Sequence, residues 1–192
     1  MRKIILQEFT TIDGFAAGPK GELDFMDAFS TNRAVDQDLL YFMDTIDTIL
    51  LGRLTYELFA EFWPTATTDT EIIADRLNGM PKLVFSKTLE AAPWGEWKEA
   101  KVMRADAADE LRNLKQQPGK DMVLWGSLKL AQSLMKERLI DEYQLRVCPL
   151  AIGKGKHLFP PDFRLSHLRL MNTKVYEQGI VLMNYEINNN QS

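Results

Sequence analysis

The sequence predicts an α/β domain with a central, mostly parallel, twisted sheet and helices on both faces. Short apolar runs alternate with amphipathic segments along most of the chain, which is typical of a parallel sheet covered by helices. Two of these runs lead directly into a glycine and a helix start. Near the end of the chain, two alternating segments flank Gln178-Gly179 and predict an antiparallel hairpin at one edge.

The amino-terminal part begins with an apolar run at residues 3–10, which predicts a buried strand. Residues 11–31 are expected to form a long loop punctuated by glycines, and a loop of this length is usually functional or mobile. Apolar residues then recur at helical spacing, so an amphipathic helix should start near Asn32. Its apolar positions are Val35, Leu39, Phe42 and Ile46.

A second apolar run, at residues 48–51, predicts another buried strand. A helix over residues 55–63 should follow and end before Pro64, with a stripe of Leu54, Leu58 and Phe62 on its apolar face. Residues 71–78 predict a short helix that Gly79 ends.

The carboxyl-terminal half continues the alternation of strands and helices. A helix is expected over residues 106–115, where acids in the first turn and a lysine in the last suit the helix dipole. A second helix should open at Gly126-Ser127, and residues 149–161 form a loop rich in glycine, lysine and proline. The remaining strands are expected at residues 82–86, 101–103, 122–125, 143–147, 168–176 and 180–187.

Length and composition restrict the classes of protein. A chain of 192 residues without repeats or a linker predicts a single domain, over residues 1–187, with a polar tail at residues 188–192. The net charge of −4 argues against a nucleic-acid partner. One cysteine and two histidines leave no thiol-based or histidine-rich metal site. The first apolar run ends at Gln7-Glu8, and no run approaches a membrane span, so we expect a cytoplasmic protein.

Candidate binding residues cluster where predicted strands end. Gly52 and Gly126 each connect a strand to a helix start, a position where backbone N–H groups can approach an anionic ligand. Two such turns favour a ligand with two phosphates, and Arg53 adds a cation. Ser86-Lys87 ends a third strand with a hydroxyl and a cation that suit a phosphate monoester. The alternative is that each glycine only makes a tight turn.

Several motifs, taken together, resemble a known family. Residues 51–57, Leu-Gly-Arg-Leu-Thr-Tyr-Glu, are similar to the GR-x-T-[WY]-E signature of dihydrofolate reductase. Over almost the whole chain the closer resemblance is to the C-terminal reductase domain of the riboflavin-biosynthesis protein RibD. The further motifs that carry it, in chain order, lie at residues 11–17, 82–89, 126–128, 139–142 and 149–159.

The resemblance implies a dihydrofolate-reductase-like fold and an NADPH site. By this similarity three short groups of residues would hold the cofactor. Gly52, Arg53 and Thr55 would bind phosphates, and Ser86 with Lys87 would lie beside the adenosine 2′-phosphate. The pyrophosphate would be held by Gly126, Ser127 and Leu128, and the nicotinamide would lie near Asp13, Gly14 and Phe15.

The sequence also departs from the family patterns. Ser127 stands where the family has a second glycine, so the backbone around the pyrophosphate would be more crowded. The substrate motifs of the riboflavin-pathway enzyme are absent, which argues against a role in riboflavin synthesis. The long loop lacks the tryptophan–proline pair of dihydrofolate reductase. Counting back from Gly52 places Asp36 near that enzyme's pterin-binding carboxylate, although Asp38 and Asp44 lie on the same predicted helix.

These observations together predict an NADPH-dependent reductase that transfers hydride to a C=N or C=O carbon of a small, pterin- or pyrimidine-like substrate. Asp36 is the candidate catalytic residue, and no metal is required. We expect a homodimer, because the late strands would otherwise leave an open sheet edge. Two alternatives remain, a non-catalytic nucleotide-binding protein and a reductase that binds flavin in the same clefts.

Overall fold

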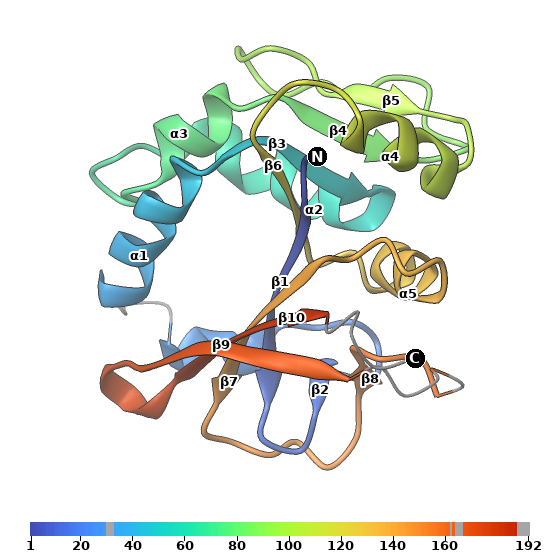
Figure 1. Cartoon of the computed structure of the whole chain (residues 1–192). Helices are drawn as coiled ribbons and strands as arrows, with labels where there is room; N and C mark the ends of the chain where they lie inside the picture. Colours follow the sequence, from blue (N-terminus) through green and yellow to red (C-terminus); the bar gives the residue numbers. More distant parts are fainter. Residues whose placement is uncertain (30–32, 162, 164–166, 188–192) are drawn as a thin grey trace.

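The computed structural model of the protein describes residues 1–29, 33–161, 163 and 167–187 (Figure 1). The predicted helix start at Asn32 and the predicted polar tail at residues 188–192 lie outside this part of the chain. Within it, eight strands form one sheet in the order β5-β4-β3-β6-β1-β7-β10-β9, and β2 pairs with β8 in a small second sheet. Parallel pairs join β5 through to β7, and β10 and β9 add an antiparallel hairpin at one edge, which confirms the predicted fold class.

The elements alternate along the chain as the sequence predicts. The strands are β1 (Ile4–Thr11), β2 (Phe15–Ala17), β3 (Ile46–Gly52), β4 (Lys82–Phe85), β5 (Lys101–Met103), β6 (Asp121–Trp125), β7 (Glu142–Cys148), β8 (Lys156–His157), β9 (Leu168–Val175) and β10 (Val181–Ile187). The α-helices are α1 (Arg33–Met43), α2 (Arg53–Phe62), α3 (Ala74–Gly79), α4 (Ala107–Lys115) and α5 (Leu128–Lys136). Short 3-10 helices are η1 (Asp24–Phe29), η2 (Trp63–Thr65) and η3 (Glu177–Gly179).

Helices cover both faces of the sheet, with α1 and α3 on one side and α4 and α5 on the other (Figure 1). Alternate residues of the central strands supply the two cores. On β1, Ile4 and Leu6 pack with α4 and α5, whereas Ile5 packs with the side chains of α1, α2 and α3. Because neighbouring side chains of a strand point to opposite faces, a continuous apolar run here serves two separate cores.

Two segments that the sequence analysis treats as loops contain regular structure. Part of the predicted loop at residues 11–31 forms β2 and η1, and part of the predicted loop at residues 149–161 forms β8. Phe15 of β2 pairs with His157 of β8, and their rings lie 4.4 Å apart. These short strands pair although they lie far apart in the sequence, and local periodicity does not reveal such a long-range pairing.

The predicted apolar stripe of the helix after β3 is wrong. Leu54, Leu58 and Phe62 are all exposed, and Tyr56 is the buried residue of α2. Tyr56 packs near Trp94 and donates a hydrogen bond to the Pro93 carbonyl oxygen at 2.8 Å. The α2 helix therefore packs on the core through Tyr56, with the partly buried Phe59 and Ala60 beside it, and its leucines lie on another face.

Charged residues join the amino ends of the strands. Lys115, at the end of α4, lies 2.6 Å from the Asp141 carboxylate, which also accepts a hydrogen bond from the Ile4 N–H. Arg2 pairs with Asp47 and donates a hydrogen bond to the Thr48 hydroxyl. These contacts hold β1 beside the starts of β3 and β7, so they position the central strand.

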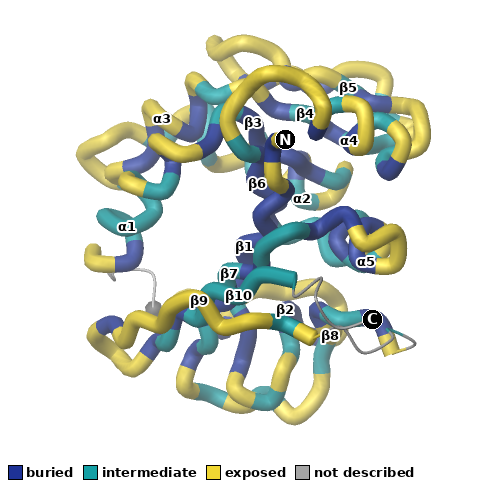
Figure 2. Tube along the Cα trace, in the orientation of Figure 1, coloured by how far each residue is buried: buried dark blue, intermediate teal, exposed yellow. Residues whose placement is uncertain are grey.

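The edge strand β9 is the most exposed strand of the large sheet (Figure 2). Leu170, Met171 and Val175 are large apolar residues with more than half of their surface accessible on this strand. In the part of the chain that the structure describes, no helix is both long enough and apolar enough to cross a membrane.

Candidate functional site: a cavity at the carboxyl ends of the strands

A cavity of about 760 Å³ opens at the carboxyl ends of the central parallel strands. Its lining comes from β1, β2, β6, α2, α5 and neighbouring segments. One part of the wall is rich in glycine, hydroxyl and basic residues from the starts of α2 and α5, and another part is aromatic and aliphatic. The residues of the second part include Phe9, Met26, Leu58, Phe59, Trp63, Leu77 and Trp125.

The cavity arises where β1 and β6 part. The pairing of β1 with β6 ends at Gln7 opposite Trp125, whereas the pairing of β1 with β7 continues to Thr11 opposite Cys148. From Glu8 onward, β1 therefore has an open edge on the β6 side. Ligands commonly bind in such crevices at the carboxyl ends of parallel strands.

The starts of α2 and α5 lie side by side where β1 and β6 diverge. The Ser127 hydroxyl accepts a hydrogen bond from the Gly52 N–H at 2.7 Å, and the Thr55 hydroxyl accepts one from the Ser127 N–H at 2.9 Å. The two predicted glycine turns are thus linked by reciprocal hydrogen bonds. Gly52, Thr55, Gly126, Ser127 and Leu128 all line the cavity, so the structure brings these predicted binding residues together.

Glycine at both turns lets the starts of α2 and α5 approach each other closely at the cavity. A Cβ atom on Gly52 would lie 3.4 Å from the Ser127 side chain, and Gly126 has a φ of +53° that favours glycine. Two helix amino termini that open on one cavity favour negative charge through their N–H groups and dipoles. Ser127, at the position of the family's second glycine, also has a left-handed φ of 58° and closes part of this space with its side chain.

Basic residues border the same region. Arg53, Lys129 and Lys156 line the cavity from α2, α5 and β8, and all three are exposed. Arg53 also forms an exposed ion pair with Glu57 one turn further along α2, at 2.7 Å. Such a pair is weak in water, so the guanidinium remains available to an anion.

The predicted pair Ser86 and Lys87 lies beyond the cavity lining, just past the end of β4. Phe85, the last residue of β4, lines the cavity and pairs with Gly52 of β3. The Ser86 hydroxyl accepts hydrogen bonds from the Thr88 and Leu89 N–H groups, so it shapes the turn. Lys87 is exposed on this turn. A role for the two residues beside a 2′-phosphate stays a prediction.

Asp13 and Gly14 lie in the turn between β1 and β2, and Phe15 is the first residue of β2. None of the three lines the cavity, although the next residue, Ala16, does. The Asp13 carboxylate accepts hydrogen bonds from the Thr11 hydroxyl and from the Ile152 and Gly153 N–H groups. These hydrogen bonds lower the pKa of Asp13 below its usual value, that of the Thr11 hydroxyl most. Asp13 therefore ties the turn to the loop before β8, and its place near a nicotinamide stays a prediction.

Asp36, the candidate catalytic residue, lies on α1 outside the cavity lining. Burial raises the pKa of its carboxyl, and the nearby charge of Arg146 acts in the opposite direction. Arg146 itself lines the cavity and is 3% exposed. Asp36 can thus influence the cavity through Arg146, and direct contact with a substrate stays a prediction.

The sequence analysis missed a chain of polar side chains on the cavity floor. The Trp125 ring N–H donates a hydrogen bond to the Gln7 side-chain oxygen at 2.7 Å, and the Gln7 amide donates one to the Gln144 side-chain oxygen at 2.7 Å. The chain spans β6, β1 and β7. It holds Gln7 and Trp125 in one orientation at the point where β1 and β6 part.

Glu8 and Arg146 are also missed functional candidates. Both are buried and both line the cavity. Among the residues that the structure describes, Oε2 of Glu8 and Nε of Arg146 have no hydrogen-bond partner. A signal was present in the sequence: Gln7 and Glu8 interrupt an apolar strand, and Arg146 interrupts another. A charged residue in a buried strand is costly unless it is paired or binds something.

These features define a class of protein: an α/β domain of dihydrofolate-reductase-like architecture with a cavity across the carboxyl ends of its central strands. The chain belongs to the family of the RibD C-terminal domain, whose model matches residues 2–182. This confirms the resemblance that the motifs predict.

Individual relatives agree with this assignment. The uncharacterized protein YyaP of Bacillus subtilis (strain 168) is 32% identical over 191 residues, which cover 97% of this chain and 96% of YyaP. A Shewanella sp. PV-4 protein, provisionally described as a riboflavin biosynthesis protein, has a similar structure, with a TM-score of 0.78, 21% identity and coverage of 97% and 99%. Dihydrofolate reductase from Enterococcus faecalis, complexed with NADP(H), gives a TM-score of 0.63, 14% identity and coverage of 97% of each chain.

Proposed function

We propose that this protein is an NADPH-dependent reductase of a small pyrimidine- or pterin-like heterocycle. One observation carries the proposal: a single cavity joins two helix amino termini with basic neighbours to an aromatic wall that suits a flat ring. The family and the similarity to a dihydrofolate reductase that binds NADP(H) support the same conclusion.

The two parts of the cavity would bind different molecules, the cofactor and the acceptor. The starts of α2 and α5, with Arg53, would hold the phosphates of the cofactor, and NADPH supplies hydride when it is bound. Phe59, Trp63 and Trp125 would stack against the acceptor and exclude water from it.

Titration with NADPH and with NADH tests the cofactor assignment. We expect micromolar binding of NADPH, followed by nicotinamide fluorescence and by a rise in melting temperature, and much weaker binding of NADH. Failure of both nucleotides to bind would overturn the proposal. A yellow protein after purification would instead favour a flavin-dependent reductase.

Variants of two cations test the expected 2′-phosphate site. Arg53→Ala combined with Lys87→Ala should weaken NADPH binding at least tenfold and should weaken NADH binding much less, since only NADPH carries the additional phosphate. Lys98→Ala is the matched control, because Lys98 is an exposed lysine remote from the cavity lining. Equal losses for both nucleotides would show that these cations do not bind the 2′-phosphate.

We also infer that the protein is a homodimer formed through the β9 edge. Exposed apolar side chains on an edge strand are a liability that a second copy would cover. Light scattering should give twice the chain mass. Leu170→Lys combined with Val175→Lys should shift the protein to a monomer, and a wild-type monomer would contradict the inference.

A further inference from the structure

Glu8 differs from the other acidic residues near the cavity. Among the described residues that line it, Glu8 is the only acid. It lies on β1 one residue past the end of the β1–β6 pairing, and it is 9% exposed. A ligand that enters the open edge of β1 therefore meets the Glu8 carboxyl group.

The hydrogen bonds of Glu8 are incomplete. Oε1 accepts one hydrogen bond, from the N–H of the adjacent Phe9, at 3.1 Å. Oε2 is buried and has no partner in the part of the chain that the structure describes. A buried carboxylate normally accepts several hydrogen bonds, so an unpartnered oxygen at a cavity wall indicates a group that a ligand completes.

No described cation of the cavity wall neutralises this carboxyl group. The other charged residues that line the cavity are Arg53, Lys129, Arg146 and Lys156. None of these four residues forms an ion pair with Glu8 within the described structure. On β7, Leu145 lies opposite Glu8 and Arg146 lies opposite Phe9, so Arg146 projects from the other face of the sheet.

Burial is consequently the main influence on the ionisation of Glu8. It raises the pKa of the carboxyl to about 8, and the Phe9 N–H opposes it only in part. At neutral pH the Glu8 side chain is then mostly a neutral acid, which can donate a hydrogen bond or a proton. Asp36 has a raised pKa as well, but it lies outside the cavity lining beside Arg146.

We propose that Glu8 is the catalytic acid of this site, which donates its proton to the ring nitrogen or carbonyl oxygen of a bound heterocyclic acceptor. The inference rests on the proposed reductase function and adds the group that recognises the acceptor. A neutral carboxyl selects acceptors that present an unprotonated nitrogen or oxygen beside the carbon that is reduced.

The reaction balances with the reduced nicotinamide of NADPH as the reductant. The acceptor's C=N or C=O π bond breaks, its carbon gains hydride from the reduced nicotinamide, and its nitrogen or oxygen gains the proton of Glu8. The nicotinamide loses two electrons and the acceptor gains them. Water then returns a proton to the Glu8 carboxylate.

Three variants test the proposal. Glu8→Gln keeps the shape of the side chain and cannot supply a proton at this pH, Glu8→Asp keeps the acid, and Asp36→Asn removes the competing carboxyl. Glu96→Gln is the control, because Glu96 is exposed outside the cavity lining. NADPH binding and melting temperature are measured for each variant, so that a folding defect is recognised.

The first measurement does not depend on turnover. In protein labelled with ¹³C at the glutamate carboxyl carbon, the resonance missing from Glu8→Gln identifies Glu8. We expect this resonance to titrate near pH 8. Titration of Glu8 below pH 5 would overturn the proposal, because no proton would then be available at neutral pH.

The second measurement is NADPH oxidation with dihydrofolate, dihydropterin and an aminouracil as acceptors. For any acceptor that the wild type reduces, Glu8→Gln should lower kcat about 100-fold or more, with NADPH affinity retained, and Glu8→Asp should restore part of kcat. In the wild type kcat should fall above pH 8. Activity retained in Glu8→Gln but lost in Asp36→Asn would overturn the proposal and leave the reductase function intact.

The two failures are distinguishable. Oxidation of NADPH without any effect of Glu8→Gln overturns only the role of Glu8. Binding of NADPH without reduction of any acceptor overturns the proposed function and the role of Glu8 together, even where Glu8 titrates near pH 8.

Discussion

At the amino end of β1 the charged groups are paired, whereas near its carboxyl end Glu8 and Arg146 each keep one side-chain atom without a partner in the described part of the chain. Lys115, Asp141 and the Ile4 N–H complete one another's hydrogen bonds at the amino end. At the carboxyl end, Oε2 of Glu8 and Nε of Arg146 have no partner among the described residues.

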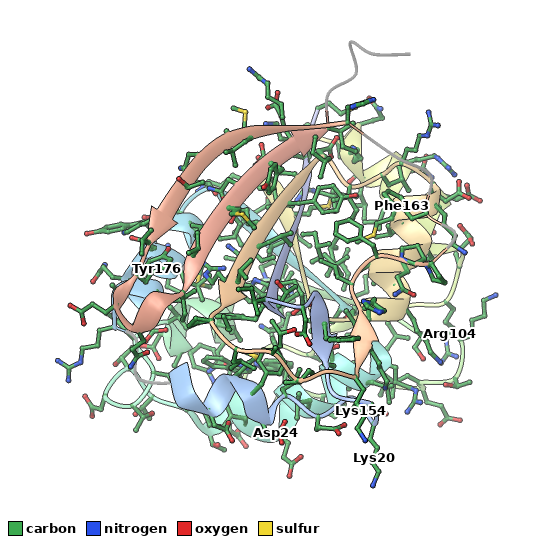
Figure 3. All side chains as sticks on the ribbon, turned by 90° about the horizontal axis from the view of Figure 1, so that it is seen from below. Lys20, Asp24, Arg104, Lys154, Phe163 and Tyr176 are labelled. Carbon is green, nitrogen blue, oxygen red and sulfur yellow. The ribbon has the colours of Figure 1, made fainter. Side chains whose placement is uncertain are left out.

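This difference distinguishes polar groups that complete one another near one end of β1 from polar groups near the other end that can still accept a ligand. A paired, buried ion network positions strands and has no capacity left for a ligand. An incomplete network beside a cavity costs stability in the free protein and recovers that cost only when a ligand completes it. In Figure 3 the β9–β10 hairpin, with the labelled Tyr176 at its turn, lies beside β7 and β1 in the same sheet.

The largest expected effect on stability comes from removing one partner of the ion pair between Lys115 and Asp141. Lys115→Met should lower the free energy of unfolding by about 3 kcal/mol, since it leaves the Asp141 carboxylate without its cation in a partly buried place. Urea denaturation at neutral pH measures the change. Arg112→Met, which removes an exposed arginine paired with Asp109 and Glu137, is the control and should have little effect. Equal losses of unfolding free energy in Lys115→Met and Arg112→Met would contradict the idea that the partly buried ion pair contributes more than the exposed ones.

At the carboxyl end of β1, the free energy of unfolding should depend on pH through Glu8. The pKa of Glu8 is raised in the folded state, so the folded protein binds more protons than the unfolded chain between about pH 4.5 and pH 8. The contribution of Glu8 to stability is therefore present at low pH and is lost as the pH rises toward 8. Relative to wild type, Glu8→Gln should gain up to about 2 kcal/mol in unfolding free energy between pH 6 and pH 7.5.

Urea denaturation at several pH values tests this difference. Glu96→Gln, the exposed control, should keep a constant difference from wild type across the same range. A constant difference for Glu8→Gln as well would mean that Glu8 is ionised in the folded protein.

A smaller effect is expected at the linked starts of α2 and α5. Ser127→Ala removes the acceptor of the Gly52 N–H and keeps the same left-handed backbone, so the loss should be about 1 kcal/mol. Ser133→Ala, at an exposed serine of α5, should cost less. Loss of NADPH affinity only in Ser127→Ala would support the role of this turn in binding. Matching melting temperatures for the two variants would mean that the Ser127 hydrogen bond adds nothing to stability.

The smallest expected effect is local. Asp13→Ala removes the acceptor of the Ile152 and Gly153 N–H groups, so these amides should exchange with deuterium faster than in the wild type. The amides of β6 serve as the internal control. Unchanged exchange at Ile152 and Gly153 would show that Asp13 does not hold this loop.

Much of the fold follows from local pattern. Apolar runs with buried positions on both faces predicted β1, β3 and β6, and the acids and the lysine of α4 lie where the helix dipole favours them. The segments that resisted prediction were short or exposed. The β2–β8 pair exists only because distant segments meet, and the apolar face of α2 is set by how Tyr56 packs against Trp94.

The candidate site divides in the same way. Glycine followed by a helix start is a local signal, so Gly52, Gly126 and Ser127 could be named from the sequence, and the structure places them side by side. The sequence by itself determined the order of the elements, the family and the two glycine turns, because these depend on periodicity and motif spacing. Only the tertiary structure decided that Glu8 lies buried at an open strand edge, with its Oε2 unpartnered among the residues that the structure describes. Burial and partners depend on which strands end beside one another, and this is a property of the sheet and not of any single segment.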